Sequence, residues 1–587
     1  MLATSARRVR WTLKVASPRG GLHPLGSTDS ILRTHSGDQN SQFPHPSQGI
    51  GLAPVGHDAK APADSGGGHR LSVESVQKPD FAPAWKVTVI MLGLGLAVLC
   101  MALDNTILAT AIPRITSEFN SLDDMGWYAS AYLLTQCSMT LVFGKLYTFY
   151  VVKWVYLTAL MLFEVGSLIC GVASNSITLI MGRAVAGMGG AGLFVGSFLI
   201  VSVITPLDKR PIYNAILSSI YGVAGAVGPL LGGAFTDYVS WRWCFYINLP
   251  IGGVTAFFVL LFFQAEKASK ARGPAFQQFL ELDIPGLVAF LPAIVCLLLT
   301  LQWGGAKYPW DSWRIITLLV AVGVLLLVFA AIEYWQQDRA IIPPSLIKSR
   351  NIWGAVVFVF CLTGSYIVFT YYLPIWFQSV KGASATMSGV KNLPLILSVT
   401  ITSMLAGWAV TSIGYYTPFM YAAPVIAAVG AGLLSTFHVH SSHAAWIGYQ
   451  ALFGIGIGLG IGLPVVVVQA VLAQERVSSG TALITFMQSI AGALFNFVAQ
   501  SVFQAELMHG LAVLAPGLNA DRILETGASM LRDVVPGDML PAVLKAYNSA
   551  VMHAFYVGVA LATAAVLGAL PLRWLSVKGR TLEPGAV

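Results

Sequence analysis

One carboxylate lies in an apolar stretch near the start of the hydrophobic part of the chain. Asp104 stands between Leu103 and Asn105, within a run long enough to cross a bilayer as a helix. An ionised carboxylate in hydrocarbon is costly, so its protonation depends on which side of the membrane water reaches it. We therefore expect Asp104 to take up and release a proton. The alternative is a helix-end carboxylate that contributes only to packing.

Two further ionisable residues share apolar surroundings. Arg183 is the only basic residue well inside an apolar span, and it needs a partner there. It acts either as a fixed positive charge beside a carboxylate or as a structural tie to carbonyl groups at a helix end. Glu164 is either a second proton-coupling group or a structural acid that is protonated or hydrogen-bonded. Asp104, Arg183 and Glu164 form the candidate proton-coupling set.

A third pattern concerns backbone flexibility rather than charge. Gly225, Gly228, Gly232 and Gly233 occur with Pro229 in one apolar span. Pro229 removes one backbone hydrogen bond, and the glycines let a neighbouring helix approach closely. The span is either a helix that bends and slides or a static packing face, and composition does not separate the two.

Aromatic and amide residues occur within or beside other spans. Such groups can line a cavity for flat hydrophobic molecules, although ordinary helix packing also explains them. The candidate cavity residues are Gln136, Tyr366, Tyr371, Tyr372, Trp376, Phe486, Gln488, Phe495 and Asn496.

Composition defines the setting in which these residues must work. Only 10% of the 587 residues are charged and 56% are hydrophobic, whereas globular proteins carry roughly 25% charged residues. A soluble enzyme is excluded, because water-bounded cores cannot bury this much apolar surface. All six cysteines lie in apolar segments, so we expect neither an aqueous disulfide framework nor a cysteine metal site. No cofactor and no other metal site is predicted.

Fourteen apolar stretches are long enough to cross the hydrocarbon as helices. Charged connections group them as six, two and six, and two six-helix bundles around a central site are typical of transporters with alternating access. The predicted fold is therefore an all-α integral membrane protein. The predicted spans are 87–112, 126–147, 154–173, 177–204, 211–235, 243–263, 284–303, 313–333, 352–375, 389–411, 417–437, 445–472, 479–503 and 550–574.

The basic residues indicate the orientation. Lys and Arg are more frequent in alternate connections when the N-terminus is placed in the cytoplasm, so both termini are predicted to be cytoplasmic. The net charge of +8 then reflects topology and not a nucleic-acid partner. The predicted parts are a disordered cytoplasmic tail (1–84), a six-helix bundle (85–263), a two-helix insert with flanking cytoplasmic connections (264–350), a second six-helix bundle (351–575) with an extracellular loop (504–549), and a cytoplasmic tail (576–587).

At these motifs the chain resembles the major facilitator superfamily, specifically its drug:proton antiporter branch with fourteen spans, in the form common in filamentous fungi. The resemblance covers about Trp85 to Leu575. It depends on four segments: Leu103 to Ile107, Gly182-Arg183, Gly225 to Gly233, and Trp241 to Gly252.

One family motif is altered. Between the second and third spans the superfamily usually has Gly-x-Leu-x-Asp-Arg-x-Gly-Arg-Lys. This chain keeps Gly144, Leu146 and Lys153, and Thr148 stands where the acid would be. The acid of the family's cytoplasmic charge latch is therefore missing.

The resemblance implies two bundles that rock about a central site while inward proton flow drives a substrate outward. We expect a monomeric, proton-coupled exporter of small hydrophobic compounds, such as toxins, secondary metabolites or drugs. The expected location is the plasma membrane, with a vacuolar membrane as the alternative. Two other functions remain open: a proton-coupled importer such as an iron-chelate carrier, and a non-transporting sensor on the same fold.

Overall fold

The computed structural model describes residues 83–121, 124–264, 283–305, 307–516, 518, 531 and 535–578. In these ranges the chain is almost entirely helical, and its only β-type pairings are two isolated bridges. The predicted all-α class is confirmed. The predicted N-terminal tail up to residue 82, most of the connection after residue 264 and the C-terminal tail from residue 579 lie outside the described residues.

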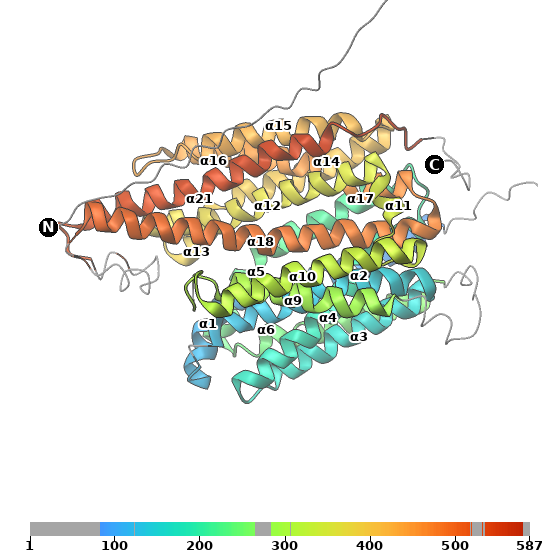
Figure 1. Cartoon of the computed structure of the whole chain (residues 1–587), viewed down its shortest axis with the longest axis horizontal. Coiled ribbons are helices and arrows are strands. Elements are labelled where there is room, and N and C mark those ends of the chain that lie inside the picture. Colours follow the sequence, from blue (N-terminus) through green and yellow to red (C-terminus); the bar gives the residue numbers. More distant parts are fainter. Residues whose placement is uncertain are drawn as a thin grey trace, which may run out of the picture. The chain divides into compact units, whose positions relative to one another are not determined.

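Seven helical segments, which correspond to the first six predicted spans, form the first half. The helices α2 and α3 pack against α4, while α5 and α7 pack against α1. Figure 1 shows α3 and α4 running side by side with α2 next to them. The segments are α1 (Ala84–Phe119), α2 (Met125–Phe149), α3 (Val152–Gly171), α4 (Ser176–Ile204), α5 (Arg210–Tyr238), α6 (Trp243–Tyr246) and α7 (Asn248–Phe262).

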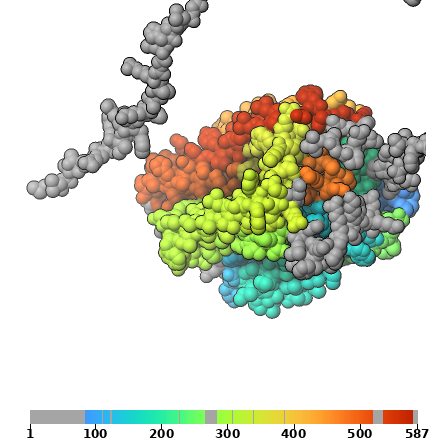
Figure 2. Space-filling view, turned by 45° about the vertical axis from the view of Figure 1, so that its right-hand side comes forward, coloured from blue at the N-terminus to red at the C-terminus, as the bar shows by residue number. Residues whose placement is uncertain are grey.

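The two-helix insert follows as α9 (Ile284–Trp303) and α10 (Trp313–Gln336), which pack against each other. The helix α9 also contacts α2 of the first half and α18 of the second. In Figure 2 the insert lies between the orange and red C-terminal helices and the blue-green helices of the first half. A short 3₁₀ turn, η2 (Gln337–Arg339), and α11 (Pro344–Lys348) lead into the second half.

Six further spans form the second half. The helix α12 packs against α18 and α21, and α16 packs against α14 and α15. The segments are α12 (Arg350–Ser379), α13 (Ala385–Lys391), α14 (Leu393–Ile413), α15 (Thr417–Leu434), α16 (His443–Gly460), α17 (Leu463–Val471), α18 (Gln474–Leu514) and α21 (Leu540–Ala569).

Thirteen helical spans in the described residues are long and apolar enough to cross a membrane. The remaining predicted span is α2, a helix of 25 residues. It is less apolar than the others because it carries several polar side chains, including Thr135, Gln136 and Thr140. With α2 included, the helices follow the predicted six-two-six order.

The limits of several spans differ from the prediction. The predicted loop 504–549 is too long: α18 continues to Leu514 and α21 already begins at Leu540. An apolar run measures the width of hydrocarbon that a helix crosses, whereas a helix can continue into water, where its polar side chains are solvated. The predicted span 445–472 is also interrupted, since α16 ends at Gly460 and α17 begins at Leu463.

Candidate functional site

A buried ion pair lies inside the first half. Nη1 of Arg183 on α4 is 2.5 Å from Oδ2 of Asp104 on α1, and the two side chains are 1% and 0% exposed. The two residues predicted separately as ionisable groups within spans are therefore each other's partners. Burial of the pair removes both charges from water, so each depends on the other and on the surrounding hydrogen bonds.

Arg183 has partners besides the carboxylate. Its Nε donates a hydrogen bond of 2.8 Å to the carbonyl of Tyr128 on α2, and its guanidinium lies 4.6 Å from the ring centroid of Tyr132. Arg183 thus faces a carboxylate and also binds a backbone carbonyl. The contacts with Tyr128 and Tyr132 do not involve Asp104.

Two polar residues that sequence reasoning did not assign to the site complete it. Asn248, at the start of α7, donates through Nδ2 to Oδ1 of Asp104 at 3.3 Å and to Oγ of Ser167 on α3 at 3.1 Å. Both oxygens of Asp104 therefore accept a hydrogen bond. In the sequence, Asn248 is a single amide residue directly before an apolar run. Its contacts with Asp104 and Ser167 become visible only once the helices are packed together.

Glu164 lies near this cluster but makes none of its hydrogen bonds. It is one turn before Ser167 on α3, and both of its carboxylate oxygens are buried without a hydrogen-bond partner among the described residues. Its side chain packs against Gly252 of α7, where a Cβ atom would overlap the carboxylate. The structure brings Asp104 and Arg183 together and leaves Glu164 in a separate environment.

The glycine motif on α5 packs against α1 directly after Asp104. A Cβ atom at Gly228 would overlap Thr106, and one at Gly232 would overlap the carbonyl of Ile107. Thr106 also donates to the carbonyl of Ala224 at 3.2 Å.

The other two glycines of the motif differ in their surroundings. Added Cβ atoms at Gly225 and Gly233 would meet no heavy atom within 4 Å. Pro229 lies inside α5, where it interrupts the backbone hydrogen bonds. Of the four glycines in the motif, Gly228 and Gly232 therefore make the close contact with α1.

Hydrogen bonds join the two halves at the end where α2 finishes and α5 begins. Oγ1 of Thr148, which replaces the family's acid, is 2.6 Å from Oγ of Ser478 on α18. Gly144 packs against Ala482 one turn deeper. A neutral hydroxyl pair thus joins the halves at the position of the missing charge.

Gln469 on α17 provides a second link at the same end. Its Nε2 donates to the carbonyl of Phe198 at 3.1 Å, and its Oε1 accepts from Nδ2 of Asn214 at 3.0 Å. Arg210 donates to the backbone carbonyl of Gln469 at 3.5 Å. Gln469 and Asn214 are fully buried, so water does not compete for these bonds in this conformation.

The nine candidate cavity residues do not form one group. The indole N–H of Trp376 donates to Asn548 at 2.8 Å, and its ring is tilted against that of Phe437 with the centroids 4.7 Å apart. Trp376 therefore belongs to the packing of the second half. The ring of Tyr372 packs against that of Phe503. Phe486 contacts Phe290 of the insert.

The remaining candidates either have side-chain polar atoms without a hydrogen-bond partner among the described residues or are partly or fully exposed. The side-chain oxygens of Gln488 and Asn496 are buried and have no partner among the described residues. The amide nitrogen of Gln136 lies 3.8 Å from the sulfur of Met101. Tyr371 is exposed, whereas Tyr366 and Phe495 are partly buried.

Comparison with known proteins defines the class. Residues 94–496 match the Major Facilitator Superfamily, and the chain belongs to that family. It is 61% identical over 581 residues to the MFS-type transporter opaD of Aspergillus ustus. This alignment covers 99% of each chain. It is 53% identical over 497 residues to the efflux pump roqT of Penicillium rubens, covering 85% of this chain and 92% of that protein.

A solved structure gives the same architecture. A bacterial homolog of the human lysosomal transporter Spinster, in an inward-facing and unoccupied conformation, matches with a TM-score of 0.51 and 13% identity. The match covers 84% of this chain and 98% of that one. At this identity the likeness concerns the fold alone. The family match and the relatives make the chain a multi-pass membrane transporter and not an enzyme.

Proposed function

We propose that this transporter exports small hydrophobic compounds in exchange for protons. The observation that carries the proposal is the fully buried pair of Asp104 and Arg183, with Asn248 bound to the second carboxylate oxygen. Ionisable groups within a spanning helix are expensive, and they mark ion or proton pathways. Proton entry supplies about 2.3 kcal/mol per 100 mV of membrane potential.

Protonation of Asp104 removes the negative charge that faces Arg183. Arg183 keeps its bond to the carbonyl of Tyr128 and its contact with the ring of Tyr132, so α4 and α2 stay in place. The weakened bond is the side-chain bond between α1 and α4, while the bond from Arg183 to the backbone carbonyl of Asp104 at 3.4 Å remains. Because Thr106 and Ile107 follow directly on α1 and contact the α5 glycines, loosening α1 also changes its close contact with α5.

The link at Thr148 and Gln469 supports alternating access. It joins the halves at the end predicted to face the cytoplasm, and its hydrogen bonds are between neutral groups or to a carbonyl. Each neutral bond contributes about 0.5–1.5 kcal/mol, which is small enough to break in a transport cycle. Opening this end would admit substrate from the cytoplasm.

The substrate site is proposed to lie between the halves. Gln488 and Asn496 have buried oxygens without a hydrogen-bond partner in the part of the chain that the structure describes. A buried polar atom without a partner is costly unless water or a ligand satisfies it. Together with Gln136, Tyr366 and Phe495, they offer aromatic surface and a few hydrogen-bonding groups. Tyr371, Tyr372, Trp376 and Phe486 support this region by packing.

Relatives named as efflux pumps, including roqT, favour export. We place both termini in the cytoplasm and the protein, as a monomer, in the plasma membrane. The proposed parts are the bundles 85–263 and 351–575 with the insert between them.

Transport into inside-out membrane vesicles tests the proposal. A proton gradient should drive uptake of fluorescent hydrophobic drugs, and Asp104→Asn should reduce that uptake at least about tenfold, as expected for loss of a coupling group. Asp237→Asn is the matched control, because Asp237 is exposed at the end of α5. Unchanged uptake by Asp104→Asn refutes the coupling role. Absence of uptake by the unmodified protein across a broad panel favours an importer or a sensor.

A further inference from the structure

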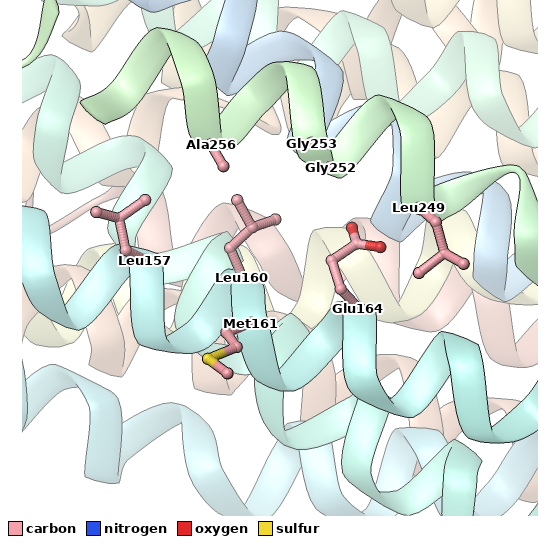
Figure 3. Close-up of a pocket in the computed structure, with 8 residues that line it drawn as sticks. All are labelled: Leu157, Leu160, Met161, Glu164, Leu249, Gly252, Gly253 and Ala256. Carbon is pink, nitrogen blue, oxygen red and sulfur yellow. The ribbon is translucent and has the colours of Figure 1, made fainter. Parts of the chain in front are cut away.

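A cavity lies between α3 and α7, on the side of the first half. It has a volume of about 290 Å³, at the small end of the range for ligand pockets. Its wall contains one polar side chain, Glu164, whose carboxylate is directed toward α7 (Figure 3). The other contributors are apolar or lack a side chain, and they include Leu157, Leu160, Ala256, Gly252 and Gly253.

The glycines shape this cavity in two ways. A side chain at Gly252 would overlap the carboxylate of Glu164, so this glycine makes room for the acid. At Gly253 an added Cβ atom would meet nothing within 4 Å, so this position leaves space empty. The cavity is therefore open beside a carboxyl group whose two oxygens have no partner among the described residues.

The surface around the cavity is apolar and exposed. Met161 on α3 is 69% exposed and Phe257 on α7 is 55% exposed, as expected for side chains that face lipid. Both helices pack chiefly against other helices of the first half, so the cavity is separate from the contact between the halves. Its ligand must come from the bilayer.

Depth within the bilayer restricts the ligand further. Glu164 lies seven residues before the end of α3 at Gly171, which is roughly 10 Å along a helix. A lipid phosphate stays at the surface and would be repelled by a carboxylate. A neutral amine with an apolar body can enter the hydrocarbon and reach the acid.

We propose that the cavity between α3 and α7 is a binding site for lipophilic amines, with Glu164 as the partner of the amino group. The carboxylic acid gives its proton to the neutral amine, and the resulting ammonium and carboxylate remain together as a hydrogen-bonded ion pair. The apolar body of the amine packs against Leu157, Leu160 and Ala256 and continues into lipid. The site goes beyond the proposed export function and does not depend on it.

Photolabelling of the full chain in lipid nanodiscs tests this site. The probe is a long-chain alkylamine with a photoreactive diazirine group, and the matched probe is the alkyl alcohol with the same chain. The amine should label peptides from α3 and α7. Glu164→Gln and Gly253→Leu should each reduce that labelling at least about tenfold, the first by removing the acid and the second by filling the cavity.

A matched control tests whether a bulky residue on any lipid-facing helix has this effect. Gly323 on α10 is exposed and its added Cβ atom also meets nothing within 4 Å, so Gly323→Leu should leave labelling unchanged. Equal labelling of the unmodified protein and Glu164→Gln would overturn the proposal. Unreduced labelling of Gly253→Leu, or equal labelling by the alcohol, would also overturn it.

Discussion

Arg183 and Asp104 are separated by 79 positions in the chain, yet Nη1 of the arginine lies 2.5 Å from Oδ2 of the aspartate. Arg183 also binds the carbonyl of Tyr128, and Asp104 also accepts from Asn248. The pair therefore ties together α1, α2, α4 and α7. Since the charge of Asp104 affects the bonds that hold α1 to α4 and α7, this pair is central to the proposed function.

Breaking the pair from one side should destabilise the protein more than removing both charges. Asp104→Ala leaves a buried, uncompensated arginine, which typically costs about 3–5 kcal/mol. The double variant Asp104→Ala with Arg183→Met should recover most of that loss. Thermal unfolding in detergent measures the effect. A double variant as unstable as the sum of the two single variants would contradict it.

The contact between α1 and α5 should be sensitive to one methyl group. Gly228→Ala places a Cβ atom against Thr106, and overpacking of this kind costs about 1–3 kcal/mol. Transport should fall at least about tenfold, because a helix that cannot pack closely cannot take up one of its conformations.

Gly225→Ala is the matched control for this contact. Its added methyl group would enter open space on the same helix, so transport should stay close to that of the unmodified protein. Equal losses in Gly225→Ala and Gly228→Ala would show that the close contact is not the cause. The measurement is the initial rate of uptake into vesicles at matched expression.

Removing the amide of Gln469 should favour opening of the end at which the halves are joined. Gln469→Leu removes the side-chain bonds to Phe198 and Asn214, each of which contributes about 0.5–1.5 kcal/mol. Spin labels at the exposed residues Lys209 and Glu475 report the distance between the halves. The population of long distances should rise about fivefold or more.

Gln450→Leu provides the control for that experiment. Gln450 is also a buried glutamine, but it binds Lys391 within the second half. Its replacement should leave the distance distribution between the halves unchanged. A shift in Gln450→Leu as large as that in Gln469→Leu would contradict the proposed link.

Acid should weaken the contact that Glu118, at the predicted outer end of α1, makes with Trp241 and Arg242. The pKa of Glu118 is lowered from its ordinary value of 4.5 because the indole N–H of Trp241 donates to its carboxylate, with Arg242 adding to the effect. Because folding lowers this pKa, the ionised carboxylate contributes its full stabilisation of the folded protein at pH values above the ordinary pKa of 4.5. It is lost as the pH falls through the lowered value.

The difference in thermal stability between the unmodified protein and Glu118→Gln reports this contact. It should be constant above about pH 5 and should shrink in more acidic solution. The difference should stay small, about 1 kcal/mol or less, since the side chain of Glu118 is 40% exposed and water screens its charge. A difference that does not change on acidification would refute the contribution of this carboxylate.

Periodicity and charge were sufficient to predict the class of fold and the unusual residues. Apolar runs give spanning helices wherever they occur, so the helices and their six-two-six order followed from the sequence. An acid or a base within such a run is costly unless it is paired, so Asp104 and Arg183 could be identified from the sequence as candidate site residues. That they bind each other depends on how α1 packs against α4, and no local pattern contains that information.

The same limit explains what was missed. Asn248 and Ser167 are ordinary polar residues in sequence, and their role depends on helices that are distant along the chain. Thr148 was recognised as a departure from the family pattern, but its contact with Ser478 required the packing of the second half. The cavity set mixed residues such as Trp376, which is satisfied by Asn548, with residues such as Gln488, because aromatic and amide side chains serve packing and binding alike.

Proton release on substrate binding tests the central claim most directly. If Asp104 carries the exchanged proton, adding a transported compound to the purified protein in weakly buffered solution should release about one proton per bound molecule near the pH at which Asp104 is protonated. Asp104→Asn should bind the compound and release none, while the exposed control Asp237→Asn should behave as the unmodified protein does. Proton release by Asp104→Asn equal to that of the unmodified protein would contradict the account.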